Sequence, residues 1–336
     1  MPRLTKTTFA LAIVHICAVA AVDAAHAQSS ARSFSYEAIS TSDWGRMPLG
    51  RTWGAPTAVK MDPDGHSLWV LERCGDYNGP GCAESDLDPI LKFDSSGRLV
   101  RSFGAGMLLF PHGLALDHEG NVWVTDGRGG NGRGHQVFKF SPQGDLLLAL
   151  GQPGVAGEGR NTLNRPSDVA IAPNGDIFVA DGHTGMDTNM RIVKYAPDGT
   201  YIKEWGRKGS APGELNGAHG LAFDSRGRLF VADRENNRVQ IFDQDGNYVD
   251  AWTQFGTPSG IFITPDDVLY VADYGAGIRM GSARTGMVTG FIAAANWDTQ
   301  SVRVGESVTV DADGVIYAGE NAGMKLMRFV LQQSGR

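Results

Sequence analysis

Residues 218–242 read AHGLAFDSRGRLFVADRENNRVQIF, and the fold prediction starts from this stretch. A short opening around a histidine leads into an apolar run, a turn at Arg226-Gly227, and a second apolar run that ends in Val231-Ala232-Asp233. Hairpin turns need the positive φ that glycine tolerates, and β-branched and aromatic residues favour strands. The stretch therefore predicts short antiparallel strands joined by tight turns.

The same unit recurs along the chain at spacings of 40 to 55 residues. Its six openings are Pro56-Thr57-Ala58, Pro111-His112-Gly113, Pro166-Ser167-Asp168, Ala218-His219-Gly220, Pro258-Ser259-Gly260 and Gly305-Glu306-Ser307. Four of the copies clearly continue with a second pair of strands, and four short antiparallel strands make one propeller blade. Because an open stack of blades would expose edge strands, the repeat predicts an all-β fold, a closed six-bladed β-propeller.

The N-terminus reads as a secretory signal peptide over residues 1–27, with Arg3 and Lys6 before an apolar run and a small-residue cleavage site at Ala25-His26-Ala27. An uncleaved membrane anchor is the competing interpretation, but the apolar run is shorter than the roughly 20 residues that a spanning helix needs. We therefore predict an exported protein, periplasmic or secreted. Residues 28–55 then form an N-terminal segment that closes the ring, and residues 56–336 form the propeller. We expect residues 34–39 to pair with a final strand at residues 325–330.

The charge balance argues against a nucleic-acid or anionic-membrane partner. The chain has 30 basic and 37 acidic residues, for a net charge of −7, with the two signs interspersed. The expected partner is instead a small-molecule or peptide substrate. After removal of the signal, only Cys74 and Cys82 remain of the 3 cysteines, and an oxidising compartment favours a disulfide between them. A zinc site is the alternative, but no second Cys/His pair lies nearby in the sequence.

The second residue of each opening predicts a ring of side chains around the axis, because the first strand of each blade lines the central channel. Alternate blades lie about 120° apart in a sixfold ring, so His112, His219 and Glu306 should converge on one point. Two imidazoles, a carboxylate and an open position are a ligand set typical of catalytic zinc. The intervening blades carry Thr57, Ser167 and Ser259 instead. Under the alternative interpretation, the same groups are channel residues that are hydrogen-bonded to water.

The loops after the second strands offer two further candidates for catalytic residues, Arg73 and His183. An arginine can bind a carboxylate bidentately. A histidine titrates near neutral pH and can act as a general base. Because exposed arginines and histidines are also common on propeller faces, the competing interpretation is that both are solvent-facing residues. Arg128 and Arg234 occupy similar loop positions and are weaker candidates.

Two resemblances follow from these residues. Residues 231–240 resemble the NHL repeat, and the block that runs from Pro111-His112-Gly113 through residues 120–126 to residues 135–140 resembles the peptidyl-hydroxyglycine amidating lyases. The second resemblance extends over roughly residues 56–330. It implies a six-bladed propeller with a catalytic zinc held by three histidines and assisted by an arginine and a tyrosine. Such an enzyme cleaves a carbinolamide to an amide and glyoxylate.

Carried onto this sequence, the resemblance places two zinc histidines on His112 and His219 and the catalytic arginine on Arg73. The third zinc histidine falls on Glu306, the tyrosine on His183, and an aspartate that helps to hold a structural calcium on Ser307. The carboxylate leaves a workable zinc site. The imidazole keeps a group that can move a proton. The serine removes one expected calcium ligand.

The resulting prediction is a zinc-dependent lyase or hydrolase that has diverged from the amidating lyases. We expect it to cleave a carbon–nitrogen or carbon–oxygen bond of a hydroxylated, carboxylate-bearing substrate. Two alternatives remain: a non-catalytic, extracytoplasmic NHL-repeat propeller that binds a partner, and a metal-dependent, lactonase-like hydrolase.

Overall fold

The computed structural model describes residues 36–39, 44–75, 77, 81–183, 188–294 and 305–331. The chain divides into two units, Met1–Ser30 and Ala31–Arg336, and the described residues all lie in the second unit. The predicted signal peptide and its cleavage site therefore lie outside the described residues. In the described part of the chain, we find no helix with the length and apolar character needed to cross a membrane.

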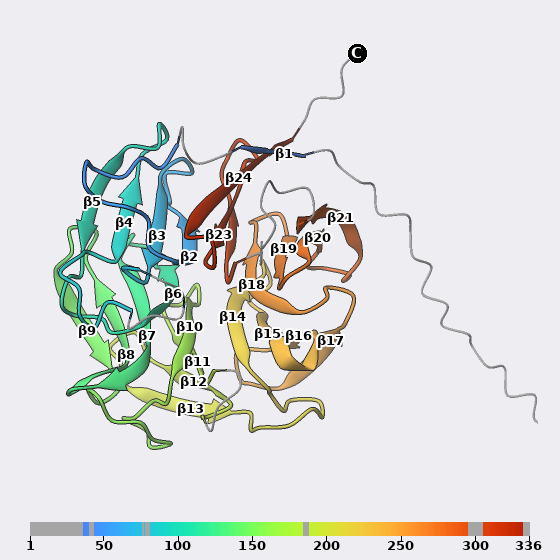
Figure 1. The fold of residues 1–336 in the computed structure, drawn as a ribbon. Helices are drawn as coiled ribbons and strands as arrows, with labels where there is room; N and C mark the ends of the chain where they lie inside the picture. The colour runs from blue at the N-terminus through green and yellow to red at the C-terminus, as the bar shows by residue number, and fades with distance from the viewer. Residues whose placement is uncertain are drawn as a thin grey trace, which may run out of the picture. The chain divides into compact units, whose positions relative to one another are not determined.

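The predicted six-bladed β-propeller is confirmed, because the described strands form six four-stranded sheets (Figure 1). Blades 1 to 3 are β2 (Pro56–Met61), β3 (Leu68–Glu72), β4 (Ile90–Phe93) and β5 (Leu99–Phe103); β6 (Pro111–Leu116), β7 (Val122–Gly130), β8 (Arg133–Phe140) and β9 (Leu146–Leu150); and β10 (Pro166–Ile171), β11 (Ile177–Asp181), β12 (Arg191–Tyr195) and β13 (Tyr201–Trp205). Blades 4 and 5 are β14 (Ala218–Phe223), β15 (Leu229–Asp233), β16 (Arg238–Phe242) and β17 (Tyr248–Trp252); and β18 (Pro258–Ile263), β19 (Val268–Asp273), β20 (Gly277–Ser282) and β21 (Val288–Ala293).

The sixth blade combines both ends of the described chain. It contains β22 (Val308–Val310), β23 (Ile316–Glu320), β24 (Lys325–Leu331) and β1 (Tyr36–Ile39), in that order from the inner to the outer edge. The early strand β1 pairs antiparallel with β24, with Tyr36 opposite Leu331. The inner strands contact one another in sequence around the axis, and β22 also contacts β2. The ring is therefore closed.

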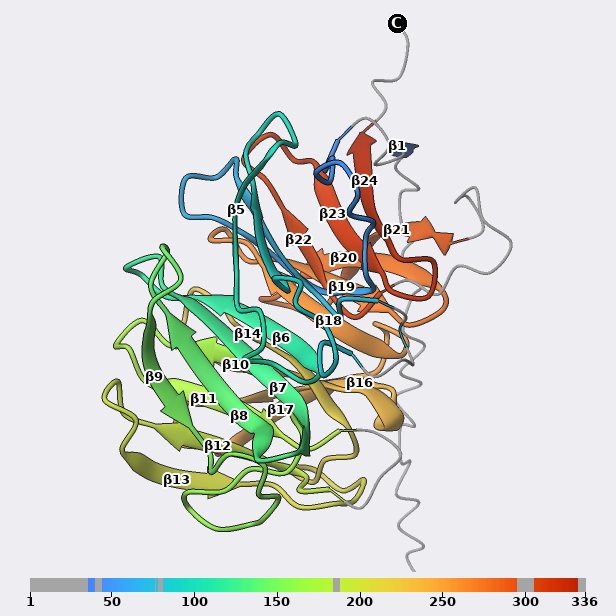
Figure 2. The same ribbon diagram turned by 60° about the vertical axis from the view of Figure 1, so that its left-hand side comes forward.

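The hydrophobic core lies between neighbouring blades. In the first of these interfaces, Trp69 and Leu71 of blade 1 pack with Val124 and Phe140 of blade 2. Equivalent clusters fill the other interfaces, including the one between the sixth and first blades, where Tyr317 packs with Val59. Because each sheet is covered on both faces, the second strands are buried along their length. Figure 2 shows the twisted sheet of β6 to β9 from the side.

A short 3-10 helix, η1 (Arg234–Asn236), lies between β15 and β16. It ends at Asn237, whose left-handed conformation suits asparagine. Arg234 is buried on this turn, at the inner side of blade 4. The turn thus brings one arginine close to the axis of the ring.

Candidate metal centre

A backbone irregularity near the start of the inner strand positions the ring residues. The pairing of the inner strand with the second strand shifts register at this point in blades 1 to 5. The shift lies between Pro111 and Leu114 in blade 2, and between Ala218 and Leu221 in blade 4. A β-bulge of this kind interrupts the ladder and re-aims a side chain. The bulge therefore directs the side chains of His112 and His219 away from the sheet.

The glycine that follows a ring residue lets the next blade approach closely. A Cβ atom at Gly113 would lie 2.6 Å from the carbonyl oxygen of Ser167, and one at Gly260 would lie 2.5 Å from that of Glu306. Separations this short are far inside van der Waals contact, so a side chain at either position would push the blades apart. The glycines therefore keep the ring small enough for side chains of different blades to meet at its centre.

Four potential ligands converge in the ring. The donor atoms of His112, His183, His219 and Glu306 all lie within 4.8 Å of one another. The Nε2 atoms of His112 and His183 are 3.0 Å apart, and the Glu306 carboxylate lies 3.7 Å from Nε2 of His112 and 3.8 Å from Nε2 of His219. Ligands bound to tetrahedral zinc at about 2.0–2.2 Å stand roughly 3.3–3.6 Å apart. The observed separations therefore suit one small cation.

Residues of the intervening blades orient the two buried histidines. Nδ1 of His112 lies 2.7 Å from the carbonyl oxygen of Ser167, and Nδ1 of His219 lies 3.3 Å from the hydroxyl of Ser259. A carbonyl oxygen only accepts, so Nδ1 of His112 carries the proton and Nε2 keeps its lone pair. Metal-binding histidines generally have such a partner on the second ring nitrogen. The hydroxyl of Ser259 also accepts a hydrogen bond from Arg234.

All three imidazoles are neutral at physiological pH. Burial, reinforced by nearby cationic arginines, holds the pKa of His112 and the pKa of His219 well below 6.5. Burial and the neighbouring His112 do the same to the pKa of His183. Neutral imidazole is the form that binds a metal.

One atom in particular points to a missing partner. Within the described residues, the buried Nε2 atom of His219 makes no hydrogen bond. Leaving a buried polar atom unsatisfied costs roughly 1–3 kcal/mol, whereas coordination of a cation would satisfy it. The residues at the centre of the ring therefore fit a zinc ion.

Glu306 is held from the side by two residues. The guanidinium of Arg73 donates a hydrogen bond to Oε2 over 3.2 Å, and the hydroxyl of Tyr77 donates to Oε1 over 3.1 Å. Arg73 is almost fully buried and also donates to the carbonyl oxygens of Tyr77 and Pro111. Its donors are therefore directed at the protein's own acceptors.

The predicted disulfide between Cys74 and Cys82 is present in the structure. It closes the loop that carries Tyr77, so the covalent link restrains the segment that supplies a phenol to the site. Sequence reasoning missed Tyr77, because the connection between the second and third strands of blade 1 is longer than those of the other blades. Comparison of the repeats therefore gives Tyr77 no equivalent position. The burial of Tyr77 and the adjacent Glu306 carboxylate raise its pKa far above the ordinary 10.0, so the phenol stays protonated.

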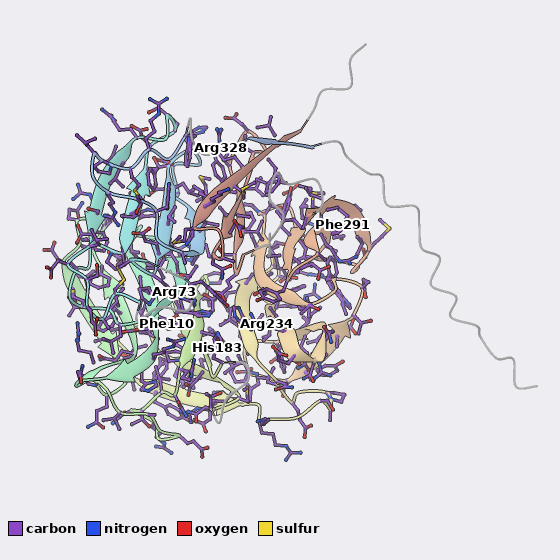
Figure 3. The ribbon with its side chains drawn as sticks, in the orientation of Figure 1. Arg73, Phe110, His183, Arg234, Phe291 and Arg328 are labelled. Atoms are coloured by element: carbon purple, nitrogen blue, oxygen red, sulfur yellow. A yellow bond between two sulfur atoms is a disulfide. The ribbon has the colours of Figure 1, made fainter. Side chains whose placement is uncertain are left out.

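The structure brings together all five residues singled out from the sequence, namely Arg73, His112, His183, His219 and Glu306. Predicted as a separate base, His183 instead lies beside the ligand set, with its ring centroid 4.8 Å from that of His112 and 5.2 Å from that of His219. It is also the least buried of the three histidines. Figure 3 shows His183, Arg73 and Arg234 around the centre of the ring.

Calcium does not fit the position next to Glu306. The Ser307 side chain lines a cavity of about 20 Å³ together with Asp168 and Lys60. Calcium requires six to eight oxygen ligands, and the ammonium group of Lys60 would repel a second cation in so small a space. The Ser307 hydroxyl is buried and has no hydrogen-bond partner among the described residues. The structure therefore gives no support for a calcium ion here.

Comparison with known proteins finds the repeat and a similarity to peptide-amidating enzymes. The family model of the NHL repeat matches residues 163–195 and 215–242. Peptidyl-glycine alpha-amidating monooxygenase A of Xenopus laevis is 32% identical over 309 residues, which cover 82% of this chain and 32% of that protein. Peptidyl-alpha-hydroxyglycine alpha-amidating lyase 1 of Drosophila melanogaster is 36% identical over 168 residues, which cover 44% of this chain and 28% of that protein. The chain thus spans about a third of the length of these relatives.

A solved structure of a gluconolactonase from Xanthomonas campestris has a TM-score of 0.59 with this chain at 18% identity, and the match covers 91% of this chain and 93% of the other. At this level of identity the likeness shows the fold alone. The matches to the two amidating enzymes, at 32% and 36% identity, indicate common descent as well as a shared fold. The chain is accordingly a six-bladed β-propeller with NHL repeats and a homologue of the peptidyl-hydroxyglycine amidating lyases.

Proposed function

We propose that this protein is an exported, zinc-dependent lyase that cleaves a carbon–nitrogen or carbon–oxygen bond in a hydroxylated substrate with a carboxylate group. The observation that carries the proposal is the convergence of three neutral histidines and Glu306 at the centre of the ring. Homology to the amidating lyases supports the reaction class. The disulfide supports export, because such bonds persist in oxidising compartments.

His112, His219 and Glu306 would hold the metal, each from a different alternate blade. When bound, zinc supplies a Lewis acid that polarises a coordinated oxygen and makes it more acidic. The carbonyl partner at Nδ1 of His112 leaves its Nε2 lone pair available, and the Ser259 hydroxyl holds the ring of His219 from its Nδ1 side. The ligand geometry is therefore set before any metal binds.

Arg73 and Tyr77 fix the position of the Glu306 carboxylate. Glu306 brings a negative charge to a position where the amidating lyases are expected to have a neutral histidine. The guanidinium of Arg73, 3.2 Å away, offsets that charge. Because the resemblance gives the amidating lyases an arginine at the position of Arg73 as well, the net charge of this site is one unit lower than with three histidines, which should make a coordinated oxygen less acidic.

His183 is placed to move a proton. It lies at the rim of the ligand set, is more accessible than His112 and His219, and has a neutral imidazole. We assign to its imidazole the acceptance of the proton from the substrate hydroxyl. Bond cleavage then requires that this proton reach the leaving group, which the same imidazole can supply.

Metal removal tests the proposal most directly. The purified protein is stripped with a chelator, zinc is restored, and release of glyoxylate and amide from a peptidyl-α-hydroxyglycine is measured at each stage. We expect activity to fall at least 100-fold on stripping and to return with zinc. Unchanged turnover in protein shown by metal analysis to be zinc-free would refute the proposal. Turnover of a lactone and not of the carbinolamide would instead assign the site to hydrolysis.

A further inference from the structure

Four arginines surround the ligand set, and they differ in whether they have a carboxylate partner. Arg73 pairs with Glu306 at 3.2 Å, and Arg234 pairs with Glu235 at 3.4 Å. Among the described residues, no carboxylate lies within ion-pair distance of Arg128 or Arg165. Buried or half-buried charges are normally paired, so these two guanidinium groups call for an anion.

Phe110 places Arg128 next to the site. The guanidinium carbon of Arg128 lies 3.6 Å from the centre of the Phe110 ring, and that of Arg73 lies 3.8 Å from the same ring. The backbone of Phe110 is held by Asp126, whose carboxylate accepts its N–H over 2.6 Å. The ring therefore acts as a fixed platform for two cations. Figure 3 labels Phe110 next to Arg73.

Arg165 has an unusual backbone conformation for an arginine. Its φ is 65°, in the left-handed region that side chains other than glycine and asparagine rarely adopt. The same position of blade 4, directly before the opening, is occupied by Gly217 with a φ of 79°. An arginine in this conformation costs roughly 1–2 kcal/mol relative to glycine. A strained non-glycine residue next to a candidate site suggests that its side chain has a function.

One side-chain nitrogen of Arg165 also lacks a partner. Its Nε atom is buried and makes no hydrogen bond with any described residue. Its charge acts on the site nevertheless. After the larger effect of burial, it lowers the pKa of Arg128 and contributes to the lowered pKa values of His112 and His183. The backbone geometry agrees, because a Cβ atom at Gly127, directly before Arg128, would lie 3.5 Å from the carbonyl oxygen of Pro166, directly after Arg165, and 3.5 Å from the Cβ atom of His112. Arg128 and Arg165 are therefore near each other and near the ligand set.

We propose that Arg128 and Arg165 form the subsite that binds the carboxylate group of the substrate. This assignment rests on the proposed function and moves the carboxylate clamp away from Arg73, whose donors are already used by Glu306 and two backbone carbonyls. Two guanidinium groups can share one carboxylate through paired, charge-assisted hydrogen bonds. The substrate class is then one whose hydroxyl-bearing carbon lies close to a terminal carboxylate.

The choice of variant can separate binding from folding. In Arg165→Gly, the new residue suits a φ of 65°, so the fold should be at least as stable as before. Arg128→Gln removes the second charge from a half-buried, solvent-accessible side chain. Arg101→Gln is the matched control, because Arg101 is exposed on β5 and its loss changes the net charge equally.

The test uses N-acetyl-phenylalanyl-glycine and its C-terminal amide as unreactive probes that differ only in the carboxylate. Binding to the full chain is measured by calorimetry, both zinc-free and zinc-loaded. We expect the acid to bind at least tenfold more tightly than the amide, and this preference to fall at least tenfold in Arg165→Gly and in Arg128→Gln. Arg101→Gln should keep it.

Equal binding of acid and amide, no measurable binding of the acid, or an unchanged preference in both variants would overturn the subsite. These results are distinguishable from failure of the proposed function. A protein that takes up no zinc but still prefers the acid through Arg128 and Arg165 would retain the subsite and refute the lyase. A zinc-dependent lyase with no such preference would do the reverse.

Discussion

The even-numbered and odd-numbered blades use the same position of the repeat for different purposes. In blades 2, 4 and 6, this position holds His112, His219 and Glu306, whose side chains meet at the centre. In blade 3, the Ser167 hydroxyl instead lies within hydrogen-bonding distance of the carbonyl oxygens of Ala180 and Ala218, in its own blade and the next. A short hydroxyl at this position thus links blades, whereas a longer side chain reaches the axis.

The two sets also depend on each other. The carbonyl oxygen of Ser167 and the hydroxyl of Ser259 are the Nδ1 partners of His112 and His219. The odd-numbered blades therefore orient the ligands that the even-numbered blades provide. Alternation around the ring separates ligation from orientation on a similar backbone, because a register shift occurs at this position in blades 2 and 4 as well as in the odd-numbered blades 1, 3 and 5.

The largest expected difference between the two sets concerns metal binding. His112→Ala or His219→Ala should abolish stoichiometric zinc and lower the proposed lyase activity at least 100-fold, because each removes one of the three proposed ligands. Ser167→Ala should keep its zinc, since it retains the backbone carbonyl that orients His112. Metal analysis and activity assays of each variant check this, with His66→Ala, an exposed histidine, as control. Equal zinc content in all four proteins would end the distinction between the two sets.

The sixth blade differs from the other two even-numbered blades because its ligand is charged. Arg73→Met should lower the free energy of unfolding by about 3 kcal/mol, since it leaves the Glu306 carboxylate buried without its cation. The same change in a Glu306→His background should cost much less. Chemical denaturation of the metal-free proteins measures both values. If the two costs are equal, Arg73 does not act through Glu306.

Asp168, which follows the ring residue Ser167 in blade 3, should make the free energy of unfolding depend on pH. Burial raises the pKa of Asp168 from 3.8 to about 6 in the folded state. The folded protein therefore holds this proton more tightly than the unfolded chain. The contribution of Asp168 to stability is fully present below about pH 4 and is lost as the pH rises to about 6. Asp168→Asn should remove this pH dependence, on the order of 3 kcal/mol, and unfolding curves that keep the same pH dependence in Asp168→Asn would contradict the assignment.

The smallest effect is expected at the hydroxyls that link blades. Ser167→Ala should lower the free energy of unfolding by about 1 kcal/mol, the usual net worth of a buried hydrogen bond. Thr57→Val should do the same, because the Thr57 hydroxyl lies near the carbonyl oxygens of Leu71 and Pro111. Urea unfolding at neutral pH measures both. A loss above about 3 kcal/mol would show that these hydroxyls do more than link neighbouring blades.

The fold could be predicted because each opening and turn recurs six times. The number of copies of this local pattern gives the number of blades. The convergence of His112, His219 and Glu306 followed from the same repeat, since equivalent positions in a ring face one another. The parts of the site that sequence reasoning missed do not repeat. Tyr77 lies in the connection between β3 and β4, which is longer than the equivalent connections of the other blades. Arg165 is singled out by a backbone angle that no sequence pattern reveals.

The pairing of β1 with β24 imposes an order on assembly. β1, the outermost strand of the sixth blade, is synthesised before its partner β24, and the two strands can pair only after β24 has been made. Loop closure over nearly the whole chain is slow relative to the hairpins within each blade. Glu306 precedes the inner strand of that late sheet. A partly made ring can therefore hold two histidine ligands in place, but the carboxylate joins them only when the first and last strands meet.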